Sequence, residues 1–208
     1  MEDREEGLNA VGREVTSVLD AYVRRIFGRS QKGAHSYDHT LRVLSVSLQI
    51  GKEVGANMRI LYAAALLHDI GRPREEKTGV THALLSGEMS KRVLSKAGYT
   101  PQETESVVAA IRTHRFSEGL RPVSLEGEIL SDADKLDAIG AIGIFRAVAE
   151  AAATGGGMEA FLRHADEKLL KLAGLMYTEA GRRLAVSRHR VLEDFIRRLR
   201  ADMDSAIQ

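Results

Sequence analysis

Apolar residues recur at spacings of three and four along almost the whole chain, and the alternation typical of β-strands is nearly absent. This spacing places the apolar side chains of a segment on one face of an α-helix. It predicts helices at about residues 8–27, 36–54, 58–70, 82–97, 101–115, 125–138, 139–153, 158–172 and 178–201. We therefore predict an all-α fold, a bundle of helices.

Glycine and proline residues lie at several of the places where the apolar pattern predicts that a helix ends. Gly71 and Pro73 stop the third helix. The stretch 154–157, Thr-Gly-Gly-Gly, is the only one with the composition of a linker. A domain boundary there would leave about fifty residues with a modest core. We therefore predict one domain over residues 1–208, with its core at about residues 36–138 and a C-terminal helical extension.

Composition excludes several classes of protein. The chain of 208 residues has no cysteine, so disulfides and thiolate metal sites are excluded. No apolar run approaches the ~20 residues of a membrane-spanning helix, and the acidic start lacks the order of a signal peptide. With 30 basic and 29 acidic residues, the net charge of +1 points to neither nucleic acid nor membrane. We expect a cytoplasmic protein without those partners and leave a homodimer open.

Histidine and aspartate side chains occur on the predicted buried faces of five helices. For example, His39 shares an apolar stripe with Val43, and Asp132 lies between Ile129 and Leu136. The full set is His39, His68, Asp69, His82, His114 and Asp132. A lone buried histidine is usually a satisfied core residue, and buried polar groups cost free energy unless they are paired. Because one shared metal site would satisfy all six, we predict them as metal ligands.

Several segments that contain these residues resemble the HD superfamily of metal-dependent phosphohydrolases. They read HSYDHTLRV, LLHDIG, HALLSGEMS, AIRTHRF and SDADKLDAIGAIG. The later EKLLKLAGLMYTEAGRRLAVSRHRVLEDF resembles the tail of small single-domain bacterial and archaeal members, so the resemblance extends over residues 33 to about 200. It implies an HD-domain helical bundle that hydrolyses a phosphate ester or anhydride, with a nucleotide as the expected substrate.

The resemblance also implies how the ligands divide. Four match positions that every metal-bearing HD site supplies, namely His39, His68, Asp69 and Asp132. His82 and His114 match two extra histidines of a two-metal branch, whereas many single-domain relatives, including deoxynucleoside triphosphate pyrophosphohydrolases, carry only the four-ligand core. The signature of the HD-GYP cyclic-dinucleotide phosphodiesterases is absent. We expect two divalent cations, of Fe, Mn, Ni or Mg; with one cation, the two extra histidines would support the ligands or contact the substrate.

A pair of cations lowers the pKa of a bridging water and makes hydroxide available for attack on phosphorus near neutral pH. Asp69 can bridge two cations because a carboxylate has two oxygens. We also expect Asp69 to accept the proton of the water, which makes it a catalytic residue as well as a ligand.

Cationic side chains near these ligands are candidates for binding the phosphate. Lys135 comes three residues after Asp132 and thus lies on nearly the same helical face, so we expect it to be catalytic and to bind substrate. Arg72 and Arg42 are further substrate-binding candidates, although lysine and arginine are more often solvated surface residues. Arg115 is set aside because it points about a hundred degrees away from the preceding histidine.

Two other functions stay open at this stage. The resemblance includes HD-fold proteins that hold a di-iron oxygenase centre with the same six ligands, and a third class is a non-catalytic nucleotide sensor. The phosphate-binding loops GxGxxG and GxxxxGK[ST] are absent, which argues against classical dinucleotide and P-loop sites. We expect a small phosphorylated molecule as the substrate.

Overall fold

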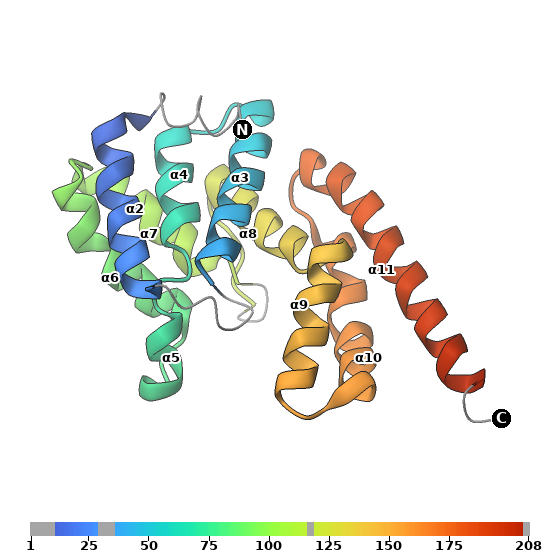
Figure 1. Cartoon of the computed structure of the whole chain (residues 1–208). Coiled ribbons are helices and arrows are strands. Elements are labelled where there is room, and N and C mark those ends of the chain that lie inside the picture. The colour runs from blue at the N-terminus through green and yellow to red at the C-terminus, as the bar shows by residue number, and fades with distance from the viewer. Residues whose placement is uncertain (1–10, 29–35, 116–118, 206–208) are drawn as a thin grey trace. The chain divides into compact units, whose positions relative to one another are not determined.

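Helices make up the regular structure of this protein, whose computed structural model describes residues 11–28, 36–115 and 119–205 (Figure 1). In chain order the elements are α2 (Arg13–Phe27), α3 (Tyr37–Val54), α4 (Met58–Leu67), α5 (Arg72–Thr78), α6 (His82–Lys96), α7 (Pro101–Thr113), α8 (Leu125–Asp137), α9 (Gly140–Ala153), α10 (Gly157–Glu167), the 3-10 helix η2 (Leu169–Leu175) and α11 (Glu179–Ser205). No β-strand occurs among the described residues, so the all-α prediction is confirmed. The predicted start of the first helix, at residue 8, lies outside them.

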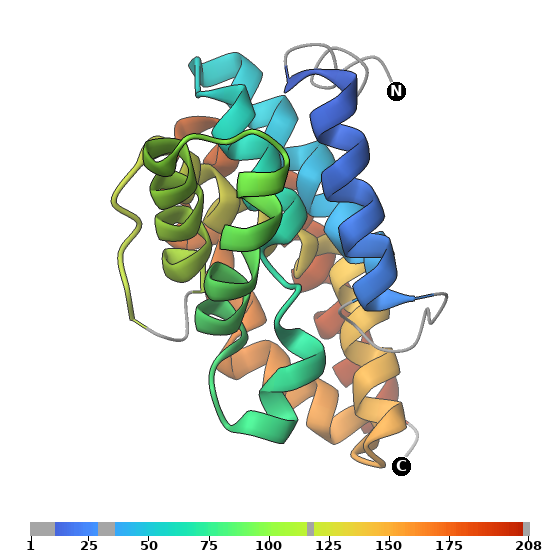
Figure 2. The same cartoon turned by 90° about the vertical axis from the view of Figure 1, so that its left-hand side faces the viewer.

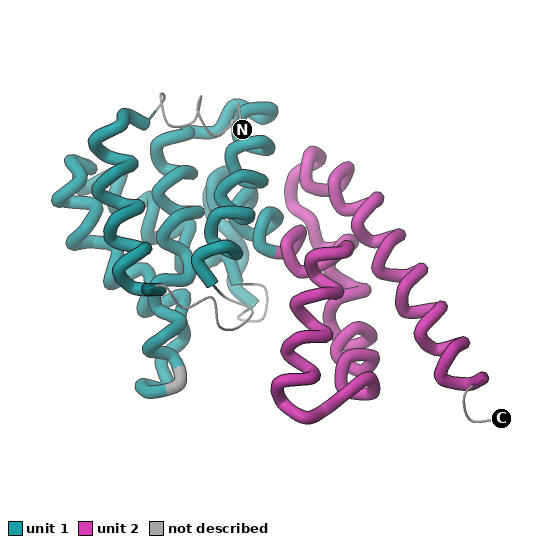
Figure 3. The backbone as a smooth tube through the Cα atoms, in the orientation of Figure 1, with its two compact units in different colours: residues 1–134 teal, residues 135–208 magenta. Residues whose placement is uncertain are grey.

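The chain forms two compact units, residues 1–134 and residues 135–208, coloured teal and magenta in Figure 3. Their boundary falls inside α8, which runs through it as one continuous helix. The glycine-rich stretch 154–157 lies inside the second unit, where it connects α9 to α10 with positive φ angles at Gly155 and Gly157. The linker-like composition therefore marks a turn and not the boundary between the units.

Helix α4 occupies the interior of the first unit. Every residue from Leu61 to Leu67 is buried, because this helix is apolar on all sides. It contacts α2, α3, α6 and α7, which are grouped around it in Figures 1 and 2. The residues that directly follow α4 therefore emerge in the middle of the unit.

Several predicted boundaries differ from the structure, among them those of the helices predicted at residues 58–70 and 158–172. The chain forms a turn after Leu67 and then enters the short helix α5, which the sequence did not predict. Pro73 stands in the first turn of α5, where its missing N–H costs no helical hydrogen bond. The helix predicted at residues 158–172 breaks at Lys168, between α10 and η2.

The second unit consists of the end of α8 together with α9, α10, η2 and α11, and α9 contacts both α10 and α11. Arginine side chains satisfy the last carbonyl groups of α8. Arg188 donates from Nη1 to the carbonyl oxygen of Leu136 at 2.6 Å, and Arg146 donates to both the carbonyl and the side chain of Asp137. Cations are favoured at a helix C-terminus, so both contacts stabilise the end of α8. No helix in the described part of the chain is long and apolar enough to cross a membrane.

Candidate metal centre

Four histidines and an aspartate meet in the first unit, where several helix ends come together. His39 lies in the first turn of α3, His82 is the first residue of α6, and His114 directly follows α7. His68 and Asp69 directly follow α4. All five side chains are buried. The structure therefore gathers five of the six predicted ligands in one place.

Hydrogen bonds to main-chain carbonyls orient two of the imidazole rings. Nδ1 of His68 donates to the carbonyl oxygen of Ala65 at 2.8 Å, and Nδ1 of His114 donates to that of Ile111 at 2.6 Å. A carbonyl oxygen can only accept, so the proton of each neutral ring is assigned to Nδ1. Nε2 of each ring therefore carries a lone pair that is available to a cation.

Asp69 is the residue on which the histidines converge. Its Oδ2 lies 3.6 Å from Nε2 of His39 and 3.7 Å from Nε2 of His68. Its Oδ1 lies 3.3 Å from Nε2 of His82. A ring nitrogen without a proton and a carboxylate oxygen are both electron-pair donors, so where the nitrogen is unprotonated their approach in a buried place calls for a cation between them.

Burial keeps two of these histidines uncharged. It lowers the pKa of both His68 and His82 to about 4, although the nearby Asp69 carboxylate acts in the opposite direction. For Asp134, burial acts to raise the pKa, but the contact with His39 outweighs it and holds the pKa well below its ordinary value. Neutral imidazoles and an ionised carboxylate are the protonation states that bind metal.

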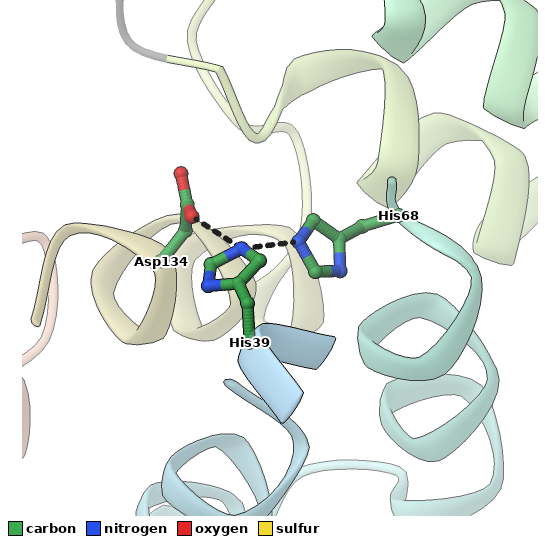
Figure 4. Close-up of side chains that lie close together, drawn as sticks. All are labelled: His39, His68 and Asp134. Carbon is green, nitrogen blue, oxygen red and sulfur yellow. Dashed lines mark hydrogen bonds and ion pairs between the residues drawn. The ribbon is translucent and has the colours of Figure 1, made fainter. Parts of the chain in front are cut away.

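Two overlapping groups of described residues could each hold a cation. One is His39, His68 and Asp134; the other is His68, Asp69 and His114. Within each group, one ligand atom of each residue lies within 4.8 Å of the others. Figure 4 shows the first group, in which Oδ1 of Asp134 and Nε2 of His68 lie 3.4 Å and 3.3 Å from Nε2 of His39. Imidazoles combined with carboxylates fit a divalent metal ion.

Besides Asp69, the structure places the carboxylate of Asp134 beside His39, 3.4 Å from its Nε2, whereas the sequence analysis selected Asp132. Asp132 is completely buried, as its apolar neighbours predict, but it belongs to neither group. Residues two apart on an α-helix point in nearly opposite directions, because each residue turns the helix by about 100°. The search for a polar residue on a buried helix face therefore selected Asp132, which faces the core. Asp134, the aspartate beside His39, has a side chain that is 30% exposed.

The three predicted phosphate-binding cations have different surroundings. Arg72 begins α5, and its Nε lies 3.3 Å from each carboxylate oxygen of Asp69, so it touches the candidate centre. Arg42 is partly buried on α3. Lys135 is buried in the second unit, and its Nζ lies 4.4 Å from the centre of the Tyr177 ring.

Two further residues beside the site were not selected from the sequence. Glu75 has both carboxylate oxygens 3.1 Å from Nδ1 of His82, and no pattern in the sequence distinguishes it from the adjacent Glu76. Arg115, set aside on its helical angle, lies 3.2 Å from Glu75 through Nη1. Its long side chain reaches the site through Glu75, so the difference in direction from His114 did not exclude it.

A family model and several curated proteins are similar to this chain in sequence. The family model described as HD domain matches residues 36–139, half of the chain. The uncharacterized protein YpgQ of Bacillus subtilis is 32% identical over 181 residues, which cover 83% of this chain and 86% of YpgQ. Ribonuclease Y of Rubrobacter xylanophilus is 31% identical over 144 residues, which cover 64% of this chain but only 26% of that longer protein.

Solved structures share the fold over nearly the whole chain. The crystal structure of Bacillus subtilis YpgQ in complex with ADP has a TM-score of 0.75 at 29% identity and covers 91% of this chain and 95% of YpgQ. A predicted HD superfamily hydrolase from an uncultured Thermotogales bacterium has a TM-score of 0.67 at 32% identity, with 92% of each chain covered.

Proposed function

This chain belongs to the HD domain family, and on that premise we propose that it is a metal-dependent phosphohydrolase that cleaves a phosphate ester or anhydride of a nucleotide. The observation that carries the proposal is the convergence of four buried histidines on the carboxylates of Asp69 and Asp134, with ring nitrogens 3.3–3.7 Å from carboxylate oxygens. Divalent cations held there would supply a water of lowered pKa and neutralise the charge of a phosphate.

Asp69 would be the residue that bridges two cations, if two are bound. Its Oδ2 faces His39 and His68, whereas its Oδ1 faces His82, so its two oxygens point to different histidines. This division supports two cations, of which one would be held by residues that include His39 and Asp134, and the other by residues that include His82 and His114. A double variant, His82→Ala with His114→Ala, should keep roughly one equivalent of Mn²⁺ and lose the other. A wild-type protein that holds a single equivalent would contradict the two-cation arrangement.

The names of similar proteins support phosphate chemistry. YpgQ has been crystallised with ADP, and Ribonuclease Y is named for cleavage of RNA. In this chain, Arg72 at the rim of the centre is 25% exposed, so its guanidinium can reach a bound phosphate while it also contacts Asp69. We assign Arg42 and Lys135 to the same task, and Lys135 also to stabilising the charge that develops during hydrolysis.

The test is hydrolysis of a nucleotide panel by chelator-treated protein, with Mn²⁺, Mg²⁺, Fe²⁺ or Ni²⁺ added back separately. Released phosphate and pyrophosphate are measured together with the nucleotide product. We expect no turnover without metal and recovery with at least one cation. Turnover that survives thorough metal removal would contradict the proposal. Oxygen-dependent turnover with iron would indicate an oxygenase, and nucleotide binding without hydrolysis under any metal would indicate a sensor.

Lys135 provides a second test at the level of one side chain. Lys135→Ala should lower kcat/KM by roughly 100-fold, as expected for the loss of one charged contact to the reacting group, while the bound metal stays unchanged. Lys91→Ala is the control, because Lys91 is an exposed lysine of α6 that pairs with Glu88. Equal turnover of the Lys135→Ala and Lys91→Ala variants would show that Lys135 does not act on the phosphate.

A further inference from the structure

The carboxylate of Glu75 contacts Nδ1 of His82, one of the candidate metal ligands. Both of its oxygens lie 3.1 Å from Nδ1 of His82, and Oε1 also accepts the main-chain N–H of His82 at 3.1 Å. Glu75 belongs to α5 and His82 to α6, so the contact joins two elements. A carboxylate that accepts a hydrogen bond from Nδ1 keeps the imidazole proton on that nitrogen.

The opposite nitrogen of the same ring points into the candidate centre. Nε2 of His82 is buried and has no hydrogen-bond partner among the described residues. It lies 3.3 Å from Oδ1 of Asp69, which is also an electron-pair donor when ionised. An unpaired buried acceptor costs free energy unless something satisfies it, so this nitrogen is arranged for a cation.

Two arginines keep the Glu75 carboxylate in place. Nη1 of Arg72 lies 3.4 Å from Oε2 of Glu75, while Nε of Arg72 contacts Asp69. Nη1 of Arg115 lies 3.2 Å from Oε1 of Glu75. The contacts therefore close into a ring that runs from Glu75 to His82, Asp69, Arg72 and back to Glu75. Arg115 contacts this ring through Glu75.

We propose that Glu75 is a positioning residue, which holds His82 with its proton on Nδ1 and thereby presents Nε2 to a divalent cation shared with Asp69. The proposal rests on the proposed function in assuming a cation at this centre. Glu75 itself need not contact the metal or the substrate. It acts through His82, as outer-shell carboxylates do in other metal sites, where their loss typically weakens metal binding about 10–100-fold.

Glu75 could instead serve only to join α5 to the start of α6, because it also accepts the main-chain N–H of His82. A double-mutant cycle separates the two roles. If Glu75 acts through the imidazole, Glu75→Ala weakens Mn²⁺ binding about 10–100-fold in wild type and has no further effect in a His82→Ala background. If Glu75 only joins the helices, its effect on Mn²⁺ is the same in both backgrounds.

A conservative variant at Glu75 and a control variant at another glutamate distinguish a loss of Mn²⁺ binding from a loss of folding. Glu75→Gln retains an oxygen that can accept from Nδ1, so it should lose only a few-fold in Mn²⁺ affinity relative to the 10–100-fold of the alanine variant. Glu88→Ala is the control: Glu88 is a carboxylate of α6 that pairs with an arginine, Arg112, and it should leave Mn²⁺ affinity unchanged.

The position of the proton can be read without metal or substrate. In the metal-free protein, ¹⁵N NMR of the imidazole rings should show His82 protonated on Nδ1, and Glu75→Ala should add or substitute the Nε2-protonated form. A wild-type His82 protonated on Nε2, or equal Mn²⁺ affinities of wild type and the Glu75→Ala variant, would overturn the proposal. A protein that binds Mn²⁺ as described but hydrolyses no nucleotide would refute the proposed function and leave this inference standing.

Discussion

Asp134 is the candidate ligand that a single substitution tests best, because the same substitution at Asp132, on the same helix, serves as a matched control. Asp134→Asn should weaken Mn²⁺ binding by roughly 100-fold or more, above the loss typical of an outer-shell residue, with little change in melting temperature, since the side chain is 30% exposed. Asp132→Asn should lower stability by about 1–3 kcal/mol, because it alters a fully buried polar group, and should leave Mn²⁺ affinity nearly unchanged. Calorimetric titration with Mn²⁺ and thermal unfolding measure both effects; the reverse pattern would restore Asp132 as the ligand.

The buried histidines make the metal-free protein sensitive to acid. His68 and His82 have pKa values of about 4 when folded, mainly because burial disfavours their charged forms, whereas an unfolded histidine titrates near 6.5. The unfolded state thus binds protons first, so this stability is present above pH 6.5 and is lost as the pH falls from 6.5 toward 4. The slope is at most about 1.4 kcal/mol per pH unit for each histidine. Urea unfolding in chelator at several pH values measures it, and His82→Gln should flatten the slope; a slope that is unchanged by this substitution would contradict the assignment.

At the scale of the elements, Gly71 controls how closely the chain after α4 approaches α6. A Cβ atom at this position would lie 2.7 Å from the carbonyl oxygen of His82 and 2.8 Å from the main-chain nitrogen of Ser86. The φ of Gly71 is −81°, so the requirement is for space and not for an unusual backbone conformation. Because main-chain atoms cannot move aside cheaply, the start of α6 and its histidine must shift when a methyl group is added.

Gly71→Ala should therefore destabilise the protein by about 1–3 kcal/mol, the usual cost of overpacking, and weaken Mn²⁺ binding in the same variant. Gly174→Ala is the control, because a Cβ there meets no atom within 4 Å and η2 carries no candidate ligand. Melting temperature and Mn²⁺ titration of both variants check this prediction. If Gly71→Ala binds Mn²⁺ like wild type, the close approach of the two segments does not position His82.

At the scale of the whole molecule, all candidate ligands belong to the unit of residues 1–134. A cation that binds only the folded state stabilises it by about 2.7 kcal/mol at a concentration of 100 times Kd. For a chain of this size, that corresponds to a rise of roughly 5–11 °C in melting temperature. Scanning calorimetry with Mn²⁺ and with chelator measures the shift, and if the two units unfold in separate transitions, only that of the first unit should move. The double variant His39→Ala, Asp134→Ala should lose the part of the shift that comes from the cation toward Asp134; an unchanged shift in this variant would place that cation elsewhere.

The sequence by itself determined the fold class, the family resemblance and most of the candidate site. Helical spacing of apolar residues is a local property, so the sequence predicted a helix at residues 58–70 whose apolar face carries His68, and this histidine is buried. The histidines were recognisable because a polar side chain on the apolar face of a helix needs a partner. When several helices carry such side chains, one shared metal site can be the partner of all of them.

Only the tertiary structure decided which residues meet. The choice between Asp132 and Asp134 depends on how α8 is rotated against its neighbours, and the apolar stripe alone pointed to the aspartate that faces the core. The contact between Glu75 and His82 depends on a short helix, α5, which has no amphipathic repeat long enough to be read from the sequence. The contact of Arg115 with Glu75 depends on how the end of α7 lies beside α5, two elements that are distant in the chain. Periodicity reports which face of a segment is buried, whereas the partner of each side chain is set by packing between segments that are distant in the chain.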